Sequence, residues 1–273
     1  MLEPPVKATA LAHGIPVLQP ERLRDPSVEE AVAAWTPDLG VVVAYGKLIP
    51  EALLQRPRFG MINVHASLLP KYRGAAPVHR AIIDGEAQTG VTIMQVVKAL
   101  DAGDMLAKAP RPIGPDETAD IVERDLAQLG ARLLVEVIPQ IEAGTLTPER
   151  QDDMLSSYAP RLTKDEGLVD WTLPAPYIHN RVRGLYPWPH AYSYLDGSRL
   201  ILLKTRLVEP PSRGTSGVPG EVVAVSRDAM HVATGHGGVI AIEELQPEGR
   251  RPMRTREFLA GRPVQPGAHF GAP

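Results

Sequence analysis

The sequence predicts an α/β domain with a mostly parallel sheet, followed by a small β-barrel, and three observations support this. In the first half of the 273 residues, short apolar runs alternate with segments of helical periodicity, as in strands linked by helices. A polar stretch then breaks the pattern. Beyond it, short strand-like segments alternate with turn residues, which is typical of a small all-β domain. We therefore divide the chain into a first domain at 1–147, a linker at 148–159 and a second domain at 160–273.

Helices and strands alternate at the start of the chain. We expect a helix, a strand, a helix and a strand at residues 5–13, 15–18, 27–35 and 39–44, and then a short helix that ends at Leu54. Ser27, with Glu30 three residues later, has the pattern of a helix N-cap. The run at 39–44 is continuously apolar, so we expect a strand that is covered on both faces and at both edges.

A strand over Met61–His65 carries two polar side chains. Asn63 and His65 are two positions apart, and residues at that spacing lie on the same face of a strand. The chain then leaves the strand at residues 67–70 and begins a helix near Pro77. Polar side chains where a strand meets a loop are the usual setting of a site in an open α/β sheet. We therefore predict a functional site here.

The first domain ends with a strand pair and a long helix. A strong strand at 91–97 is followed by a loop that contains Asp101, and a second strand returns from residue 104. Asp116 and Glu117 suit the N-terminal end of the helix, and Gly144 stops it. Its apolar residues recur at steps of three and four: Val122, Leu126, Leu129, Leu133, Val137 and Ile141.

The second domain begins with a helix over residues 176–185. The strands expected after it cover residues 191–195, 200–208, 220–226, 230–233 and 239–245. Turn signals such as Asp196-Gly197 separate them, which fits a small barrel. We expect the proline- and glycine-rich segment at 210–217 to be an exposed, flexible loop.

Composition and charge narrow the class of protein. The chain has no cysteine, so it contains no disulfide and no thiolate metal site. Its apolar runs are too short to span a membrane, and we expect a cytoplasmic protein. Residues 1–159 carry 15 Lys+Arg and 21 Asp+Glu, whereas residues 160–273 carry 14 and 11, so the second part is mildly basic. Four arginines gather there, which indicates a polyanionic partner: Arg250, Arg251, Arg254 and Arg256.

The motif from Asn63 to Pro77 resembles the folate-dependent formyltransferases, and the segments Thr89–Gln95 and Leu100–Met105 match that family in the same order. The resemblance is closest to the members that act on initiator methionyl-tRNA. It implies a Rossmann-like formyltransferase domain with a mostly parallel sheet, followed by an OB-like β-barrel that binds tRNA. It also implies 10-formyltetrahydrofolate as the formyl donor, a monomeric protein, and no metal.

The same resemblance assigns roles to residues. The catalytic trio of the family falls on Asn63, His65 and Asp101, and the loop Ser67, Leu68, Leu69 and Pro70 would form one wall of the folate pocket. The family also has a strand, a Gly-rich turn, a helix and a second strand, with a basic loop, before the point at which this sequence opens. We therefore expect the chain to be shortened at its N-terminus.

The chemistry of formyl transfer needs residues of these types. The attacking amine builds negative charge on the formyl oxygen, and losing one fixed donor to such an oxygen costs roughly 100- to 1000-fold in rate. Asn63 supplies a neutral amide donor. His65 donates an N–H or carries a proton, and Asp101 orients the imidazole or accepts a hydrogen bond from the amine. Each residue also has a structural interpretation, because a histidine at a strand end and an aspartate in a turn are common.

Three functions stay open at this point. The first is formylation of initiator methionyl-tRNA. The second is formylation of a small-molecule amine, for which a basic barrel is not needed. The third is a non-catalytic RNA-binding remnant, which the N-terminal shortening keeps open and the presence of the catalytic trio disfavours. A zinc site from His65, His79 and Asp101 is disfavoured, because only one histidine lies on the strand face.

Overall fold

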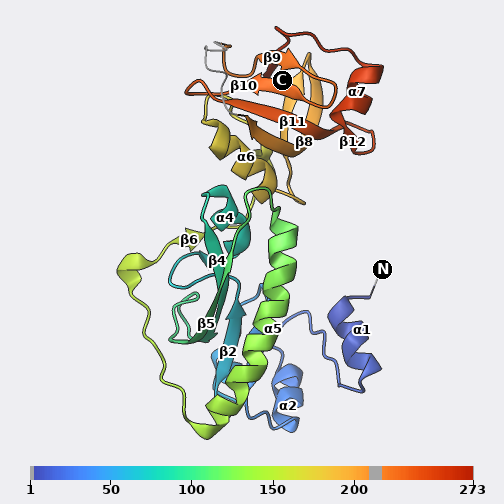
Figure 1. Cartoon of the computed structure of the whole chain (residues 1–273). Helices are drawn as coiled ribbons and strands as arrows, with labels where there is room; N and C mark the ends of the chain where they lie inside the picture. The colour runs from blue at the N-terminus through green and yellow to red at the C-terminus, as the bar shows by residue number, and fades with distance from the viewer. Residues whose placement is uncertain (1–2, 209–216, 273) are drawn as a thin grey trace.

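Residues 3–208 and 217–272 of the chain are described by the computed structural model. Figure 1 shows an α/β domain at the N-terminal side, a curled antiparallel sheet at the C-terminal side, and the helices α4 (Pro77–Ile83) and α6 (Ala175–Gly184) between them. The predicted fold class is therefore confirmed. Within the described residues, no helix is long and apolar enough to cross a membrane.

The sheet of the first domain has the strand order β1-β2-β4-β5. Its strands are β1 (Gly40–Val43), β2 (Met61–His65), β4 (Gln88–Gln95) and β5 (Met105–Pro112). Only β1 and β2 are parallel, and the pairs β2–β4 and β4–β5 are antiparallel, so this part of the sheet is less parallel than predicted. β4 returns beside β2 in the opposite direction, and β4 and β5 form an antiparallel hairpin.

One long helix covers one face of this sheet. α5 (Ala119–Ala143) packs Val122, Leu126 and Val137 against the sheet residues Ile62, Val91 and Ile93. Gly144 ends the helix in the left-handed conformation, with φ 62°, as the sequence predicts. Because neighbouring residues of a strand point to opposite faces, the side chains of Asn63 and His65 project from the other face.

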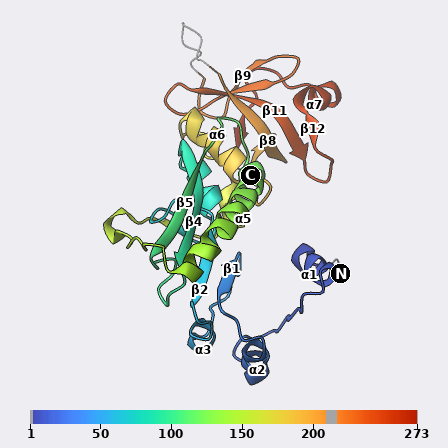
Figure 2. The same cartoon turned by 60° about the horizontal axis from the view of Figure 1, so that its bottom comes forward.

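The first strand is not covered as expected. β1 is an edge strand, and its alternate residues Val41 and Val43 are 42% and 59% exposed. The prediction of two covered faces and edges is wrong for the described residues, because β2 is the only strand that pairs with β1. Figure 2 shows β1 at the margin of the sheet.

The N-terminal helices form as predicted, although they contribute little to the core. They are α1 (Pro5–Ala12), α2 (Pro26–Ala34) and α3 (Glu51–Leu54), and α1 has no buried residue. Two expectations are wrong. Residues 15–18 form no strand, and the N-cap of α2 is Asp25, because Pro26 takes the first helical position.

The connector between the domains pairs with the first domain. β6 (Tyr158–Ala159) lies parallel to the short strand β3 (Arg73–Gly74), and the 3-10 turns η1 (Asp153–Leu155) and η2 (Lys164–Gly167) flank it. Gly74 has φ 120°, and a Cβ there would lie 2.7 Å from the carbonyl oxygen of Ala159. Glycine is therefore required for this close approach.

The second domain is an antiparallel sheet of strand order β13-β7-β8-β11-β10-β9, with β12 paired to β11. All five predicted strands are confirmed, as β7 (Ala191–Leu195), β8 (Ser198–Val208), β9 (Val222–Val225), β10 (Met230–Ala233) and β11 (Val239–Pro247). The elements β12 (Met253–Arg254), α7 (Thr255–Gly261) and β13 (Phe270–Gly271) were not predicted. The predicted flexible loop at 210–217 falls almost wholly on residues 209–216, which lie outside the described residues.

The sheet curls until its two ends meet. The N–H of Phe270, at one end, donates to the carbonyl oxygen of Gly220 at 2.7 Å, and the N–H of Val222, at the other end, donates to that of Ala268 at 2.8 Å. Large apolar side chains fill the interior, among them Phe270, Leu200 and Ile240. The curled shape agrees with the predicted barrel.

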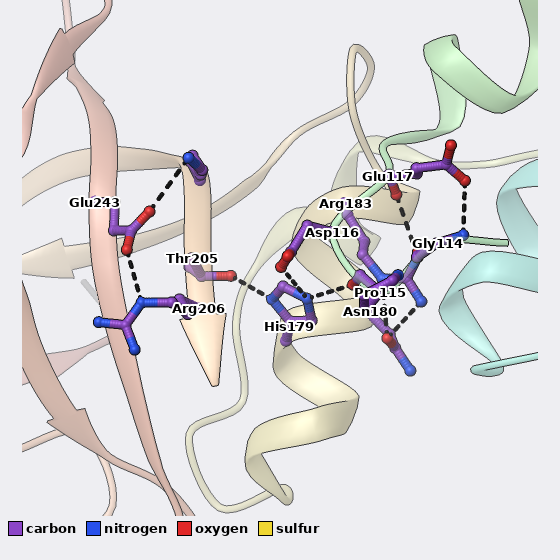
Figure 3. A network of polar contacts seen from close by, with 11 residues as sticks. Gly114, Pro115, Asp116, Glu117, His179, Asn180, Arg183, Thr205, Arg206 and Glu243 are labelled. Carbon is purple, nitrogen blue, oxygen red and sulfur yellow. Dashed lines mark hydrogen bonds and ion pairs between the residues drawn. The ribbon is translucent and has the colours of Figure 1, made fainter. Parts of the chain in front are cut away.

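Two histidines connect the domains. In Figure 3, His179 of α6 lies between Thr205 of β8 and the loop that precedes α5. Its Nε2 donates to the carbonyl oxygen of Pro115 at 2.9 Å, so its Nδ1 accepts from the Thr205 hydroxyl at 3.0 Å. On the other side, Nδ1 of His79 in α4 donates to the carbonyl oxygen of Gly184 at 2.6 Å. The domains therefore contact each other through backbone acceptors on both sides.

Candidate active site

The candidate site is built on the face of the first sheet that α5 leaves free. The cross-strand register places Asn63 opposite Met94 and His65 opposite Thr92, so these four side chains share one face. Asn63 is half-buried, whereas the side chain of His65 is only 6% exposed. The prediction that Asn63 and His65 lie on one face is confirmed by this register.

His65 and Asp101 lie side by side. The Nδ1 atom of His65 is 3.8 Å from Oδ2 of Asp101, which is an ion-pair distance. Nε2 donates to the carbonyl oxygen of Tyr72 at 2.9 Å. The same Oδ2 of Asp101 accepts the N–H of Gly74 at 2.9 Å. Only Nδ1 of the ring is therefore free for a reacting group, and the carboxylate stands next to it.

The two residues that contact His65 have strained backbones. Tyr72 has φ 62° and Asp101 has φ 46°, both in the left-handed region that non-glycine residues avoid. Such conformations cost on the order of 1–3 kcal/mol each and persist only where the surroundings hold them. Two residues after Asp101, a Cβ on Gly103 would lie 1.9 Å from the carbonyl oxygen of Gln95. This loop therefore has little freedom to choose another path.

The side chain of Tyr72 holds the segment that carries the carbonyl bound to His65. Its hydroxyl donates to Asp84 at 3.1 Å and to Glu86 at 3.0 Å. Burial, and then the nearby carboxylates, raise the pKa of the Tyr72 phenol, so the phenol stays a donor. A hydrogen bond from Lys71 lowers the pKa of Glu86, which stays an acceptor.

The loop predicted as the folate wall is anchored by Thr92 of β4. The Thr92 hydroxyl donates to the carbonyl oxygen of Ser67 at 2.7 Å and accepts the N–H of Leu69 at 3.1 Å. The Ser67 hydroxyl donates to the carbonyl oxygen of Lys71 at 2.7 Å. The polar groups of Ser67, Leu69 and Thr92 named here therefore already have hydrogen-bond partners within the protein. The loop is thus a fixed surface, with half-buried Leu68 and Pro70 as its more accessible members.

Asn63 lies on the same face of the sheet as a small apolar cluster. Leu69, Met94 and Met105 form a buried cluster on its face of the sheet. No hydrogen-bond partner of the Asn63 amide occurs in residues 3–208 and 217–272. A half-buried amide without a described partner is suited to hydrogen-bond the polar edge of a ligand.

The structure adds residues that the sequence reasoning missed. Thr92 fixes the loop at residues 67–70, and Gln151 donates to the carbonyl oxygens of Asp101 and Gly103 at 2.9 and 2.7 Å. A signal for Thr92 was present in the sequence, because Thr92 lies within the segment Thr89–Gln95 that matches the family. Gln151 had no local signal, since it lies in a polar connector.

Two further predictions concern charge and metals. The barrel residues Arg250, Arg251, Arg254 and Arg256 are all exposed, around the β11–β12 turn and the start of α7. In the part of the chain that the structure describes, no group of three or more His, Cys, Asp or Glu side chains is placed to hold a metal ion.

Comparison with known proteins finds matches for both domains. Residues 2–138 match the family model for formyl transferase, and residues 161–263 match that for the formyl transferase C-terminal domain. The chain is 49% identical over 270 residues to the methionyl-tRNA formyltransferase of Citrifermentans bemidjiense. The aligned residues are 99% of this chain and 83% of that protein.

Two solved structures share the fold at lower identity. HypX from Aquifex aeolicus, in complex with tetrahydrofolic acid, is 21% identical with a TM-score of 0.64, over 86% of this chain and 41% of that one. An N-formyltransferase from Helicobacter canadensis, in complex with folinic acid and dTDP-3-aminofucose, is 18% identical with a TM-score of 0.63, over 86% of this chain and 81% of that one.

Proposed function

The chain belongs to the formyl transferase family, and from that premise we propose that it transfers the formyl group of 10-formyltetrahydrofolate to the amino group of methionine on initiator methionyl-tRNA. The observation that carries the proposal is the 49% identity to a methionyl-tRNA formyltransferase across both domains. The likeness to the amino-sugar enzyme is 18% and supports the fold alone. A small-molecule acceptor is therefore the weaker candidate.

The proposed chemistry is acyl transfer. The methionine amine attacks the formyl carbon, and a new C–N bond forms. The bond from that carbon to the folate nitrogen then breaks; the attacking amine loses one proton, and the folate nitrogen takes up one in place of the formyl group. Asn63 is the proposed donor to the developing oxyanion, because its amide is unpaired and faces the open side of the sheet. His65 contributes through Nδ1, since Tyr72 occupies Nε2.

Asp101 has two proposed tasks. Its carboxylate, 3.8 Å from Nδ1 of His65, orients the imidazole, and it accepts a hydrogen bond from the attacking amine. The side chain is 15% exposed, so it is accessible from the open face while the N–H of Gly74 holds it. This arrangement supports the catalytic assignment of Asn63, His65 and Asp101.

The residues around Asn63 fit a pterin-bearing donor. Half-buried Leu68 and Pro70 offer apolar contact, and the Asn63 amide offers a polar one. We assign Ser67, Leu68, Leu69 and Pro70 to the wall of that pocket through their backbone and the Leu68 side chain. Ser67 serves the wall by fixing its shape, because its hydroxyl is bound to Lys71.

The experiment that tests this function is a comparison of acceptors. The purified chain is incubated with formyl-labelled 10-formyltetrahydrofolate and with initiator methionyl-tRNA, elongator methionyl-tRNA or a nucleotide-linked amino sugar, and His65→Ala serves as the background. Label is expected on initiator methionyl-tRNA. Label on the amino sugar alone would support the small-molecule function, and a folded protein that labels no acceptor would support the non-catalytic one.

A further inference from the structure

Gln151 is a buried glutamine whose amide is fully used. It lies in the connector between the domains and is 6% exposed. Its Nε2 donates to the carbonyl oxygen of Asp101 at 2.9 Å and to that of Gly103 at 2.7 Å. Both acceptors belong to the loop that carries the candidate catalytic carboxylate. A buried side chain that satisfies two carbonyls of one loop restrains the path of that loop.

The other end of the same amide reaches a second segment of the site. Oε1 of Gln151 accepts from Nε of Arg73 at 3.0 Å. Arg73 stands between Tyr72, whose carbonyl oxygen binds His65, and Gly74, whose N–H binds the Asp101 carboxylate. One side chain therefore ties together the two segments that meet at His65.

The loop needs such a restraint. Asp101 holds φ 46°, a conformation that a non-glycine residue leaves unless neighbours hold it. The bond from Gln151 is made to the carbonyl of Asp101 itself, so it acts on the strained residue. The Asp101 carboxylate keeps its 3.8 Å approach to His65 only while this backbone is in place.

We propose that Gln151 is a positioning residue for the His65–Asp101 pair. It touches neither reacting atom, and it acts by fixing the Asp101 loop and, through Arg73, the Tyr72–Gly74 segment. The inference rests on the proposed function, in which His65 and Asp101 take part in formyl transfer. It adds a residue from the interdomain connector to the site.

The first test replaces the amide with side chains of similar length. Gln151→Met removes all three hydrogen bonds, whereas Gln151→Glu keeps an acceptor for Arg73 and loses both donations to the loop. Both variants are expected to lower kcat by about 10- to 100-fold, as displacement of a reacting group by about 1 Å does, with KM for both substrates unchanged. Gln140→Met is the matched control, because it makes the same change at an exposed position of α5.

The second test separates positioning from general stability. Gln151→Met is made in the wild-type background and in an Asp101→Asn background, and the fold-change in rate is compared. If Gln151 acts through Asp101, the second change adds little to the first. The ring ¹⁵N signals of His65 are recorded for each variant, and they are expected to move in Gln151→Met in the direction that Asp101→Asn moves them.

Each outcome decides the proposal. An equal rate loss in both backgrounds, with unchanged His65 signals, would overturn it. If Gln151→Met does not fold, Gln151→Glu undergoes the same measurements, because it keeps the contact to Arg73. If the wild-type chain transfers no formyl group, the proposed function fails, and the His65 signals still report whether Gln151 holds Asp101 against the ring.

Discussion

Asn63 and Asn180, the only asparagines of the chain, have opposite settings in the structure. Asn63 faces the open side of the sheet without a described partner, whereas Oδ1 of Asn180 accepts two bonds from buried Arg183, at 3.0 and 2.8 Å. Asn63→Ala is expected to lower the rate of formyl transfer by roughly 100- to 1000-fold and to leave the unfolding midpoint nearly unchanged, because it removes a donor to the oxyanion.

Asn180→Ala is the matched control at this scale. It removes the one acceptor atom that binds two N–H groups of the Arg183 guanidinium, and we expect about 1.5–3 kcal/mol of lost stability with the catalytic rate retained. Rate assays and chemical unfolding of both variants provide the check. A slow Asn180→Ala enzyme alongside an active Asn63→Ala enzyme would contradict the assignment.

At the scale of elements, the stability that buried His179 of α6 contributes depends on pH. Burial lowers the pKa of His179, whose Nδ1 accepts from Thr205. The folded chain then binds a proton at His179 less readily than the unfolded chain does. The contribution of His179 to the free energy of unfolding is therefore complete above about pH 6.5, and it is lost as the pH falls through the lowered pKa. His179→Gln is expected to flatten the acid side of the curve of unfolding midpoint against pH.

His79 has the opposite effect on how stability depends on pH. Burial opposes its charge, but hydrogen bonds to Glu123 and to the carbonyl of Gly184 outweigh burial and raise its pKa. Its contribution is therefore present below about pH 6.5 and is lost as the pH rises through the raised pKa. His79→Gln should lower the midpoint mainly at acid pH. Parallel curves for the two variants would contradict both assignments.

β1 gives a second prediction at the element scale. Val41 and Val43 are exposed on an edge strand, a setting that favours association between chains. The double change Val41→Thr and Val43→Thr is expected to raise solubility without lowering the unfolding midpoint. Val91→Thr, at a fully buried position of β4, is the control and should cost roughly 1–3 kcal/mol. Light scattering and thermal unfolding distinguish the two results.

At the scale of the whole molecule, the second domain carries exposed arginines that we expect to bind a polyanion. Replacing Arg250, Arg251, Arg254 and Arg256 with Gln is expected to weaken tRNA binding and to reduce the slope of log K against log salt by up to about 0.9 for each lost phosphate contact. Arg251 should contribute least, because it contacts Glu257 at 3.4 Å.

The control for this prediction uses two basic residues that share one carboxylate partner. Lys204 and Arg206 both pair with Glu243, at 3.3 and 2.9 Å, and their replacement with Gln should change the slope little. Binding of labelled initiator tRNA is measured across a salt series for both variants. A slope that responds only to the Lys204 and Arg206 changes would place the RNA contact on that face.

Local patterns in the sequence were sufficient for the elements and for part of the site. The periodicity of α5, the β4–β5 hairpin and the five barrel strands were all predicted, because each signal lies within a few neighbouring residues. The same holds for the shared face of Asn63 and His65, which follows from the two-residue period of a strand.

Only the tertiary structure decided how distant segments meet. The antiparallel pairing of β2 with β4, the exposure of β1 and the approach of Asp101 to His65 depend on packing rather than on local preference. Gln151 is the clearest case, since its partners Asp101 and Arg73 are 50 and 78 residues away along the chain. A polar residue in a connector carries no periodic signal, and its hydrogen bonds exist only once the folded chain brings their donors and acceptors together.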